Sequence, residues 1–274
     1  MIEDPRYTVE PWGIRETHLD LDQLAQSESV FALSNGHIGI RGTLDEGEPY
    51  ALPGTYLNAF WEARPLPYAE AGFGYPEAGE TVVNMTNGKV IRLLVDDSPF
   101  DIRYGELLEH ERRLDFRTGI LSRTVLWRSP TGKTVRVGSE RLVSFAQRAV
   151  VAIRYTVEPT AAPVRVVVQS ELVTNEPRPA MSKDPRAAAA LEAPLESELF
   201  MGDNTRGVLV HVTKESRLRA AAAMGHEIDG PEDCAYDSAS AWEDLAMLTV
   251  NATPAPGEPL TITKFVTYGW SARV

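Results

Sequence analysis

The feature that most limits the fold of this sequence is a long series of short β-rich segments separated by Gly, Pro and Asn. From residue 88 onward the chain reads GKVIRLLVDD, RAVVAIRYTVEP and APVRVVVQSEL, each bounded by turn residues. The pattern returns in TRGVLVHVTKES, LAMLTVNA and PLTITKFVTYG. Such a series predicts a meander of antiparallel strands and therefore an all-β fold.

Turn chemistry predicts two hairpins. Residues 121–129 and 134–143 are joined by PTGK, in which Pro presets φ and Gly132 can adopt a positive φ. Near the N-terminus, SVFALS leads into Asn35-Gly36 and out through HIGIRG. A two-residue type I′ turn needs a positive φ at both central positions, so Asn35-Gly36 is expected to form the turn.

Helical signals are few. Asp184-Pro185 before RAAAALEA predicts one short helix, and residues 65–80, PLPYAEAGFGYPEAGE, predict a loop. The charged run at residues 109–113 is expected to form a solvated strand edge. Because no repeat or linker divides the chain, we expect one domain over residues 1–274, a large antiparallel two-sheet β-sandwich with few short helices.

Charge and cysteine content exclude several classes of protein. The chain carries 27 Lys+Arg against 39 Asp+Glu, a net charge of −12, which disfavours nucleic acid as a partner. Cys234 is the single cysteine, so no internal disulfide or cysteine metal site is expected. No apolar run approaches the ~18 residues of a membrane span, and the start lacks a basic, apolar leader. These features predict a cytoplasmic protein without a membrane partner.

The sequence contains neither a phosphate-binding loop nor a nucleophile-elbow or zinc-protease motif. GHIGIRG follows a hairpin turn and precedes no helix, and GxSxG and HExxH are absent. The five His are scattered, and His211 is expected to be a strand residue with a satisfied ring. We therefore expect no catalytic residue, no metal ligand and no cofactor in this chain.

The aromatic residues in or beside the Gly/Pro-rich segment at residues 65–80 are the most suggestive candidates for a sugar-binding site. Exposed rings there could stack on the apolar faces of sugars, although core packing or an interface explains them equally well. The residues concerned are Tyr56, Phe60, Trp61, Tyr68, Phe73 and Tyr75.

Four segments, taken in order, resemble the N-terminal domain of glycoside hydrolase family 65. They are SESVFALSNGHIGIRGT, PGTYLNAFWE, LLVDDSPFDI and LDFRTGILSRTVLWRSPTGKTVRVGSERLVSF. The family includes maltose, trehalose and kojibiose phosphorylases and related α-glucoside hydrolases. The resemblance implies a super-sandwich similar to galactose mutarotase, packed against an (α/α)6 barrel that follows it.

The resemblance also implies where catalysis takes place. Family members carry the general-acid Glu and the phosphate site in the barrel, whereas this sequence ends at TKFVTYGWSARV without a helix-rich region. The chain alone is therefore expected to be inactive, within a parent that cleaves α-linked glucose disaccharides by inverting phosphorolysis or hydrolysis. Inorganic phosphate would be a co-substrate, and the partners would be the parent's own barrel and a second subunit in a homodimer.

Within this chain, the resemblance leads us to expect a structural and assembly role beside the active site. The candidate substrate-proximal residues are Asn35, Arg41, Tyr56, Trp61 and Tyr75. Arg41 could instead pair with an acidic neighbour inside the sandwich. The alternative function is a stand-alone carbohydrate-binding or mutarotase-like module, which would require a His acid and a Glu base facing each other in a pocket.

Overall fold

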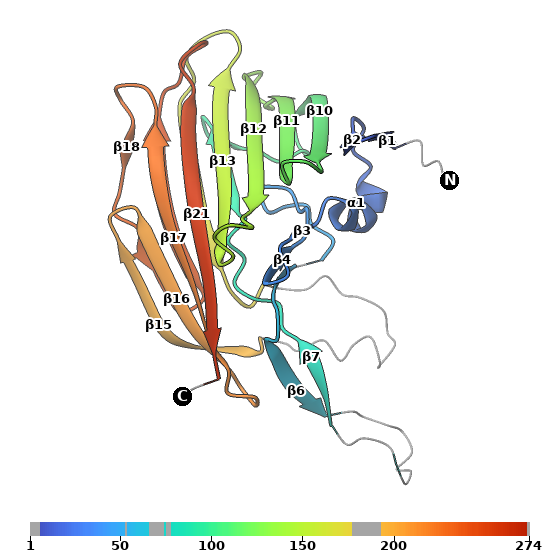
Figure 1. Cartoon of the computed structure of the whole chain (residues 1–274). Helices are drawn as coiled ribbons and strands as arrows, with labels where there is room; N and C mark the ends of the chain where they lie inside the picture. Colours follow the sequence, from blue (N-terminus) through green and yellow to red (C-terminus); the bar gives the residue numbers. More distant parts are fainter. Residues whose placement is uncertain (1–5, 53, 66–73, 75–77, 177–192, 273–274) are drawn as a thin grey trace.

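The computed structural model describes residues 6–52, 54–65, 74, 78–176 and 193–272. Within this part, the chain forms a sandwich of a 10-stranded and a 6-stranded antiparallel sheet (Figure 1), with a 3-stranded and a 2-stranded sheet beside them. The two-sheet, all-β prediction is confirmed. No helix of the described part is long and apolar enough to span a membrane.

The large sheet contains most of the long strands. Residues 106–159 and residues 195–229 each form an antiparallel meander, and the last strand lies between the two. In spatial order the strands are β1 (Tyr7–Glu10), β2 (Gly13–Glu16), β10 (Glu106–Asp115), β11 (Ile120–Arg128), β12 (Thr134–Val143), β13 (Val150–Pro159), β21 (Leu260–Ser271), β17 (Arg219–Asp229), β16 (Arg206–Thr213) and β15 (Leu195–Asp203).

The second sheet has strands β18 (Ala235–Tyr236), β20 (Leu245–Ala252), β14 (Val166–Val173), β8 (Ile91–Val95) and β9 (Ser98–Pro99), and β19 (Ser240–Ala241) also pairs with β20. The small sheets consist of β3 (Leu33–Ser34), β4 (Ile38–Ile40) and β5 (Thr55–Leu57), and of β6 (Trp61–Pro65) and β7 (Ala78–Val82). The helices are the 3-10 turn η1 (Leu21–Gln23) and α1 (Leu24–Val30).

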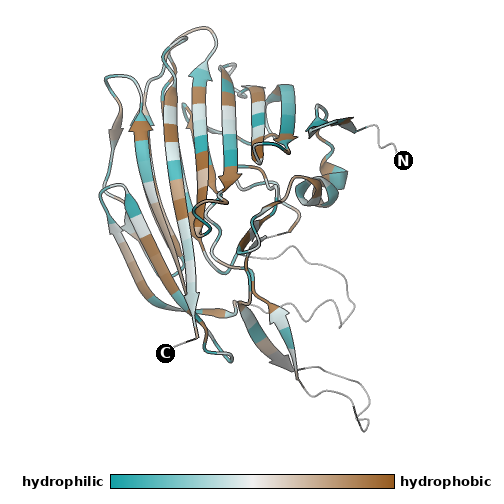
Figure 2. Ribbon diagram, viewed as in Figure 1, coloured by the Kyte–Doolittle hydropathy of each residue, from teal (hydrophilic) through white to brown (hydrophobic). Residues whose placement is uncertain are grey.

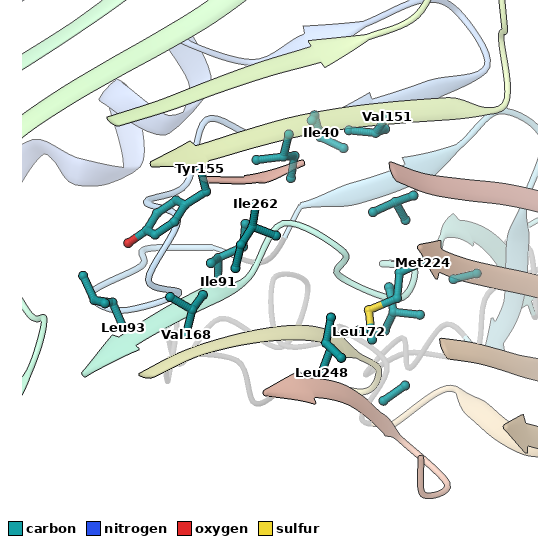
Figure 3. Close-up of a cluster of buried hydrophobic side chains, with 14 of the residues drawn as sticks. Ile40, Ile91, Leu93, Val151, Tyr155, Val168, Leu172, Met224, Leu248 and Ile262 are labelled. Carbon is teal, nitrogen blue, oxygen red and sulfur yellow. The ribbon is translucent and has the colours of Figure 1, made fainter. Parts of the chain in front are cut away.

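The core lies between the two large sheets because successive side chains of a strand point to opposite faces. Hydrophobic and hydrophilic residues alternate along the strands in Figure 2. Figure 3 shows Tyr155 and Ile262 of the large sheet near Leu93 and Val168 of the second sheet, all of them buried. The period of two therefore places one face of each sheet in the common core.

The two predicted hairpins form, but one of them has a different turn. Gly132 adopts a φ of 85° between β11 and β12, as expected. In the N-terminal hairpin, the Asn35 N–H donates to the Ile38 carbonyl, so the loop residues are Gly36 and His37. The prediction of Asn35-Gly36 as the central pair was wrong by one position. The Asn35 side chain accepts bonds from the N–H groups of His37 and Ile38, which favours this register.

Two other local predictions differ from the structure. Residues 65–80 are not wholly loop, since β6 and β7 extend into both ends of this segment. Residues 29 and 30 of the predicted first hairpin strand belong to helix α1, leaving only two strand residues in β3. The helix predicted after Asp184 falls outside the described residues.

Candidate functional site

A cluster of buried charges lies between the two large sheets. Asp45, which follows β4, accepts bonds from Arg141 Nη2 and Ser139 Oγ, both at 2.7 Å. The neighbouring Glu46 accepts a bond from Arg123 Nη2 at 2.9 Å. Burial alone would raise the pKa of Asp45, but the positive charges of Arg141 and Arg123 lower it below its usual value. Asp45 therefore remains an ionised partner of the arginines.

A second cluster attaches helix α1 to the large sheet. Glu16 of β2 lies 2.7 Å from Arg112 Nη2 of β10, and it also accepts a bond from Ser27 Oγ at 2.5 Å. Arg112 Nη1 donates to the Gly42 carbonyl at 2.9 Å. Burial would raise the pKa of Glu16, but the bond from His110 and the charge of Arg112 outweigh it and lower the pKa to about 2.

The solvated edge predicted for residues 109–113 is therefore wrong for His110 and Arg112, which are buried. Strand alternation directs both side chains toward the core side of β10, where Glu16 compensates the charge of Arg112. The charged run in the sequence does not by itself indicate that His110 and Arg112 are buried. The acidic residue that pairs with Arg112 lies nearly a hundred positions earlier in the sequence.

Asn35 and Arg41, two of the predicted substrate-proximal residues, make structural contacts. Asn35 Nδ2 donates to the carbonyl groups of Ser144 and Arg148, fixing the β3–β4 hairpin to the turn after β12. Arg41 Nη2 lies 3.2 Å from Glu28 Oε2 and also donates to the Ala25 carbonyl. Arg41 thus has the acidic neighbour that the sequence analysis offered as the alternative. A substrate contact by either residue stays a prediction.

The predicted aromatic residues do not form a single cluster in the described structure. Tyr56 is exposed on β5, opposite Gly39 of β4. Trp61 begins β6 and packs against the hydrophobic core. Tyr75 lies outside the described residues.

Glu62, which the sequence analysis did not identify, anchors the β6–β7 hairpin. Its buried carboxylate accepts bonds from the N–H groups of Glu215 and Ser216 at 3.0 and 2.7 Å. Ser216 Oγ also donates to the Trp61 carbonyl. The hairpin is consequently fixed to the turn between β16 and β17, although the two segments lie about 150 positions apart in the sequence.

Two buried lysines have no carboxylate within salt-bridge distance in the described part. Lys89 Nζ donates to the Gly54 carbonyl and to Thr55 Oγ1, and Lys264 Nζ donates to the carbonyls of Val90 and Glu171. Burial lowers the pKa of each lysine to about 7. Among the described residues, no group of three or more His, Cys, Asp or Glu is placed to hold a metal ion.

Comparison with known proteins gives a family match over nearly the whole chain. Residues 14–274 match the model described as glycosyl hydrolase family 65, N-terminal domain. The chain is 57% identical over 272 residues to an uncharacterized glycosyl hydrolase of Mycobacterium tuberculosis, covering 99% of this chain and 34% of that protein. It is 33% identical over 272 residues to the α,α-trehalose phosphorylase of Thermoanaerobacter brockii, covering 96% of this chain and 35% of that protein.

Among solved structures, a putative kojibiose phosphorylase from the human microbiome has the same fold. The TM-score is 0.84 at 20% identity, and the match covers 97% of this chain and 33% of the other. The chain thus spans about a third of the length of the relatives it matches.

Proposed function

Because the chain belongs to glycosyl hydrolase family 65, whose N-terminal domain it forms, we propose that it is the non-catalytic sandwich of an α-glucoside-cleaving enzyme. The parent acts on α-linked glucose disaccharides by inverting phosphorolysis or hydrolysis, with phosphate as co-substrate in the first case. The domain packs against a helical catalytic barrel and contributes to assembly, including a homodimer. A cytoplasmic location is part of the same proposal.

The family match over residues 14–274 carries this proposal, and the ion pairs of three buried carboxylates agree with it. The general acid of an inverting glycosidase needs a raised pKa, so that it holds a proton near neutral pH. Here the pKa values of the buried or partly buried acids Glu16, Asp45 and Asp101 are all lowered. Their arginine partners keep them ionised. These acids stabilise the fold and are poorly suited to donate a proton to a leaving group.

The β6–β7 hairpin supports a role at the border of the active site. It projects from the sandwich (Figure 1), and Glu62 fixes its base. A hairpin that is attached to the sandwich near one end and projects from it is suited to contact a neighbouring domain. We propose that this hairpin, which begins at Trp61, forms a wall beside the substrate together with Tyr56. Asn35 and Arg41 support this region through their intramolecular bonds, and Tyr75, which lies outside the described residues, belongs to the proposal by its place in the sequence alone.

A mutarotase-like activity is the less favoured alternative. His110 and Glu16 lie 3.3 Å apart, which is the pairing of residue types that such chemistry uses. However, their side chains are only 3% and 2% exposed, and Arg112 also binds Glu16. A sugar has no access to this pair without opening of the packed interface, so the pair is structural.

Alanine substitution in the full-length enzyme tests the proposed wall. Tyr56→Ala and Trp61→Ala should raise KM or lower kcat for maltose or trehalose cleavage by about tenfold, while the protein remains folded. Tyr104→Ala and Trp12→Ala are matched controls, because both rings are exposed elsewhere on the surface. Unchanged kcat and KM in both test variants would exclude a role for this segment at the substrate.

A further inference from the structure

A groove with a volume of about 800 Å³ lies where the second sheet meets the edge strand of the large sheet. Its lining comes from β8, β14, β15 and the loop between β19 and β20. Its lining shares no residue with the β6–β7 hairpin or with Asn35, Arg41 and Tyr56. The residues that matter for its chemistry are Arg92, Glu171, Phe200, Trp242, Glu243 and Asp244.

Strand alternation places an ion pair in this groove. Ile91 and Leu172 point into the core, so their neighbours Arg92 and Glu171 lie on the opposite face of the second sheet. Arg92 Nε donates to both Glu171 carboxylate oxygens at 3.2 Å. Arg92 Nη1 also donates to the Glu46 carbonyl at 3.4 Å, and because the Arg92 side chain is 43% exposed, part of its guanidinium remains accessible from the groove.

Two aromatic rings border the same groove without being buried. Trp242 is 50% exposed and Phe200 is 48% exposed. The backbone N–H of Trp242 donates to the Leu245 carbonyl at 2.7 Å, and this bond closes the two-residue loop of the β19–β20 hairpin. Phe200 lies on β15, the edge strand of the large sheet. Exposed large apolar side chains gathered beside polar groups are typical of a binding surface.

Asp244 at the end of this loop has a fixed position. Its carboxylate accepts a bond from His211 Nε2 at 2.9 Å and from Asn175 Nδ2 at 3.1 Å. Its backbone carbonyl accepts a bond from the Thr174 N–H at 2.8 Å. His211 is almost completely buried, so the contact attaches the exposed loop to the interior of the sandwich. The ring of His211 was predicted to be satisfied; Nε2 has this partner, whereas the buried Nδ1 has none among the described residues.

These features favour a neutral, polyhydroxylated ligand. Glu171 is already bound by Arg92, and Asp244 by His211 and Asn175, so both carboxylates act as positioned acceptors rather than unpaired charges. The lining carries three carboxylates, Glu171, Glu243 and Asp244, against the single guanidinium of Arg92, which disfavours an anionic ligand. Planar polar groups beside aromatic rings match the alternating hydroxyl groups and apolar faces of a sugar.

We propose that this groove is a carbohydrate-binding site, in which a sugar ring stacks on Trp242 and its hydroxyl groups bond to Arg92, Glu171 and Asp244. The site goes beyond the proposed function, because all of the residues named for it belong to this chain. Its ligand class is a neutral oligosaccharide. Phe200 forms the opposite border of the groove.

Titration of the 274-residue chain with maltotriose tests the site directly. The sequence has five Trp, so a nitrogen-15 spectrum resolves five indole N–H signals. The signal missing from the Trp242→Ala spectrum should shift in a saturable manner, while the other four do not. Trp242→Ala should weaken binding by at least about tenfold, and Trp12→Ala, which removes a ring that is 54% exposed elsewhere, should change it by less than about twofold.

A second pair of variants tests the site at a residue outside the β19–β20 hairpin, so that the result does not depend on the stability of this hairpin in Trp242→Ala. Phe200→Ala should also weaken maltotriose binding, whereas Phe145→Ala, an exposed phenylalanine in another loop, should not. The proposal is overturned if maltotriose and trehalose produce no saturable shift, if binding survives in Trp242→Ala, or if choline binds in the groove and the sugars do not. Each of these results would leave the activity proposed for the full-length enzyme unaffected.

Discussion

Asp45 and Arg141 join the two sheets of the sandwich through a buried ion pair. Arg141 Nη2 of β12 lies 2.7 Å from Asp45 Oδ1, and both side chains are nearly inaccessible to solvent. The Asp45 carbonyl accepts a bond from the Ile91 N–H of β8 at 2.7 Å. One residue thus contacts the large sheet with its side chain and the second sheet with its backbone.

Removing the Asp45 carboxylate should destabilise the domain strongly. Asp45→Ala leaves two buried arginines without this partner, and the free energy of unfolding should fall by about 3–5 kcal/mol. Urea unfolding followed by circular dichroism measures the change. Glu196→Ala is the control, because its pair with Arg217 is exposed on both sides and should contribute no more than about 1 kcal/mol. Equal effects of the two variants would contradict this account of Asp45.

Glu16 should make the domain sensitive to acid. Its pKa is about 2 in the folded protein and near 4.5 when unfolded, so its contribution of about 3 kcal/mol is present above pH 4.5. Below that pH the unfolded chain binds a proton that the folded protein rejects, and stability decreases toward pH 2. Glu16→Gln should flatten the unfolding free energy between pH 5 and pH 3, and an unchanged slope would refute the assignment.

Lys264 should make the domain more stable at alkaline pH. Burial lowers its folded pKa to about 7, whereas the unfolded value is near 10.5. Between these values the unfolded chain holds a proton that the folded protein has lost, so the free energy of unfolding should rise from pH 7 to pH 9. Lys264→Met should reduce the slope, and Lys133→Met, at an exposed site, should preserve it. A wild-type slope in Lys264→Met would show that this lysine stays charged.

Gly42 should not tolerate a side chain. A Cβ there would lie 2.6 Å from Phe31 Cβ and 2.7 Å from the Phe31 carbonyl oxygen. Gly42→Ala must therefore displace backbone beside helix α1, at a cost of about 1–3 kcal/mol. Gly138→Ala is the matched control, since a Cβ there meets no atom within 4 Å. Thermal melting compares the two, and a similar Tm for both variants would argue against a close helix contact.

The sequence predicted the two-sheet architecture more accurately than the pairing of the buried charged residues. Alternation along β11 and β12 and the turn at Gly132 are local signals, and both matched the structure. The pairing of Arg112 with Glu16 is not local, because it depends on β2 adding to the sheet beside β10. A charged residue at a buried strand position looks like a solvated one until its distant partner is known.

The candidate site was harder to predict for the same reason. Arg41 and Asn35 were chosen for their place in a hairpin, and the structure gives both a set of intramolecular partners. Glu62 and Asp244 carried no motif, and each gains its position from segments far away in sequence. Polar side chains in short segments are held in place by tertiary contacts, and the hydrophobic periodicity of a sequence does not predict those contacts.

The most direct measurement compares the 274-residue chain with the full-length enzyme in one cleavage assay. Maltose, trehalose and kojibiose are incubated with each protein, with and without phosphate, and the released glucose and glucose phosphate are quantified. Glucose mutarotation is followed by polarimetry in parallel. We expect cleavage of an α-linked disaccharide by the full-length enzyme and neither activity in the folded chain alone. Cleavage or mutarotation by the chain itself would contradict the assignment of a non-catalytic domain.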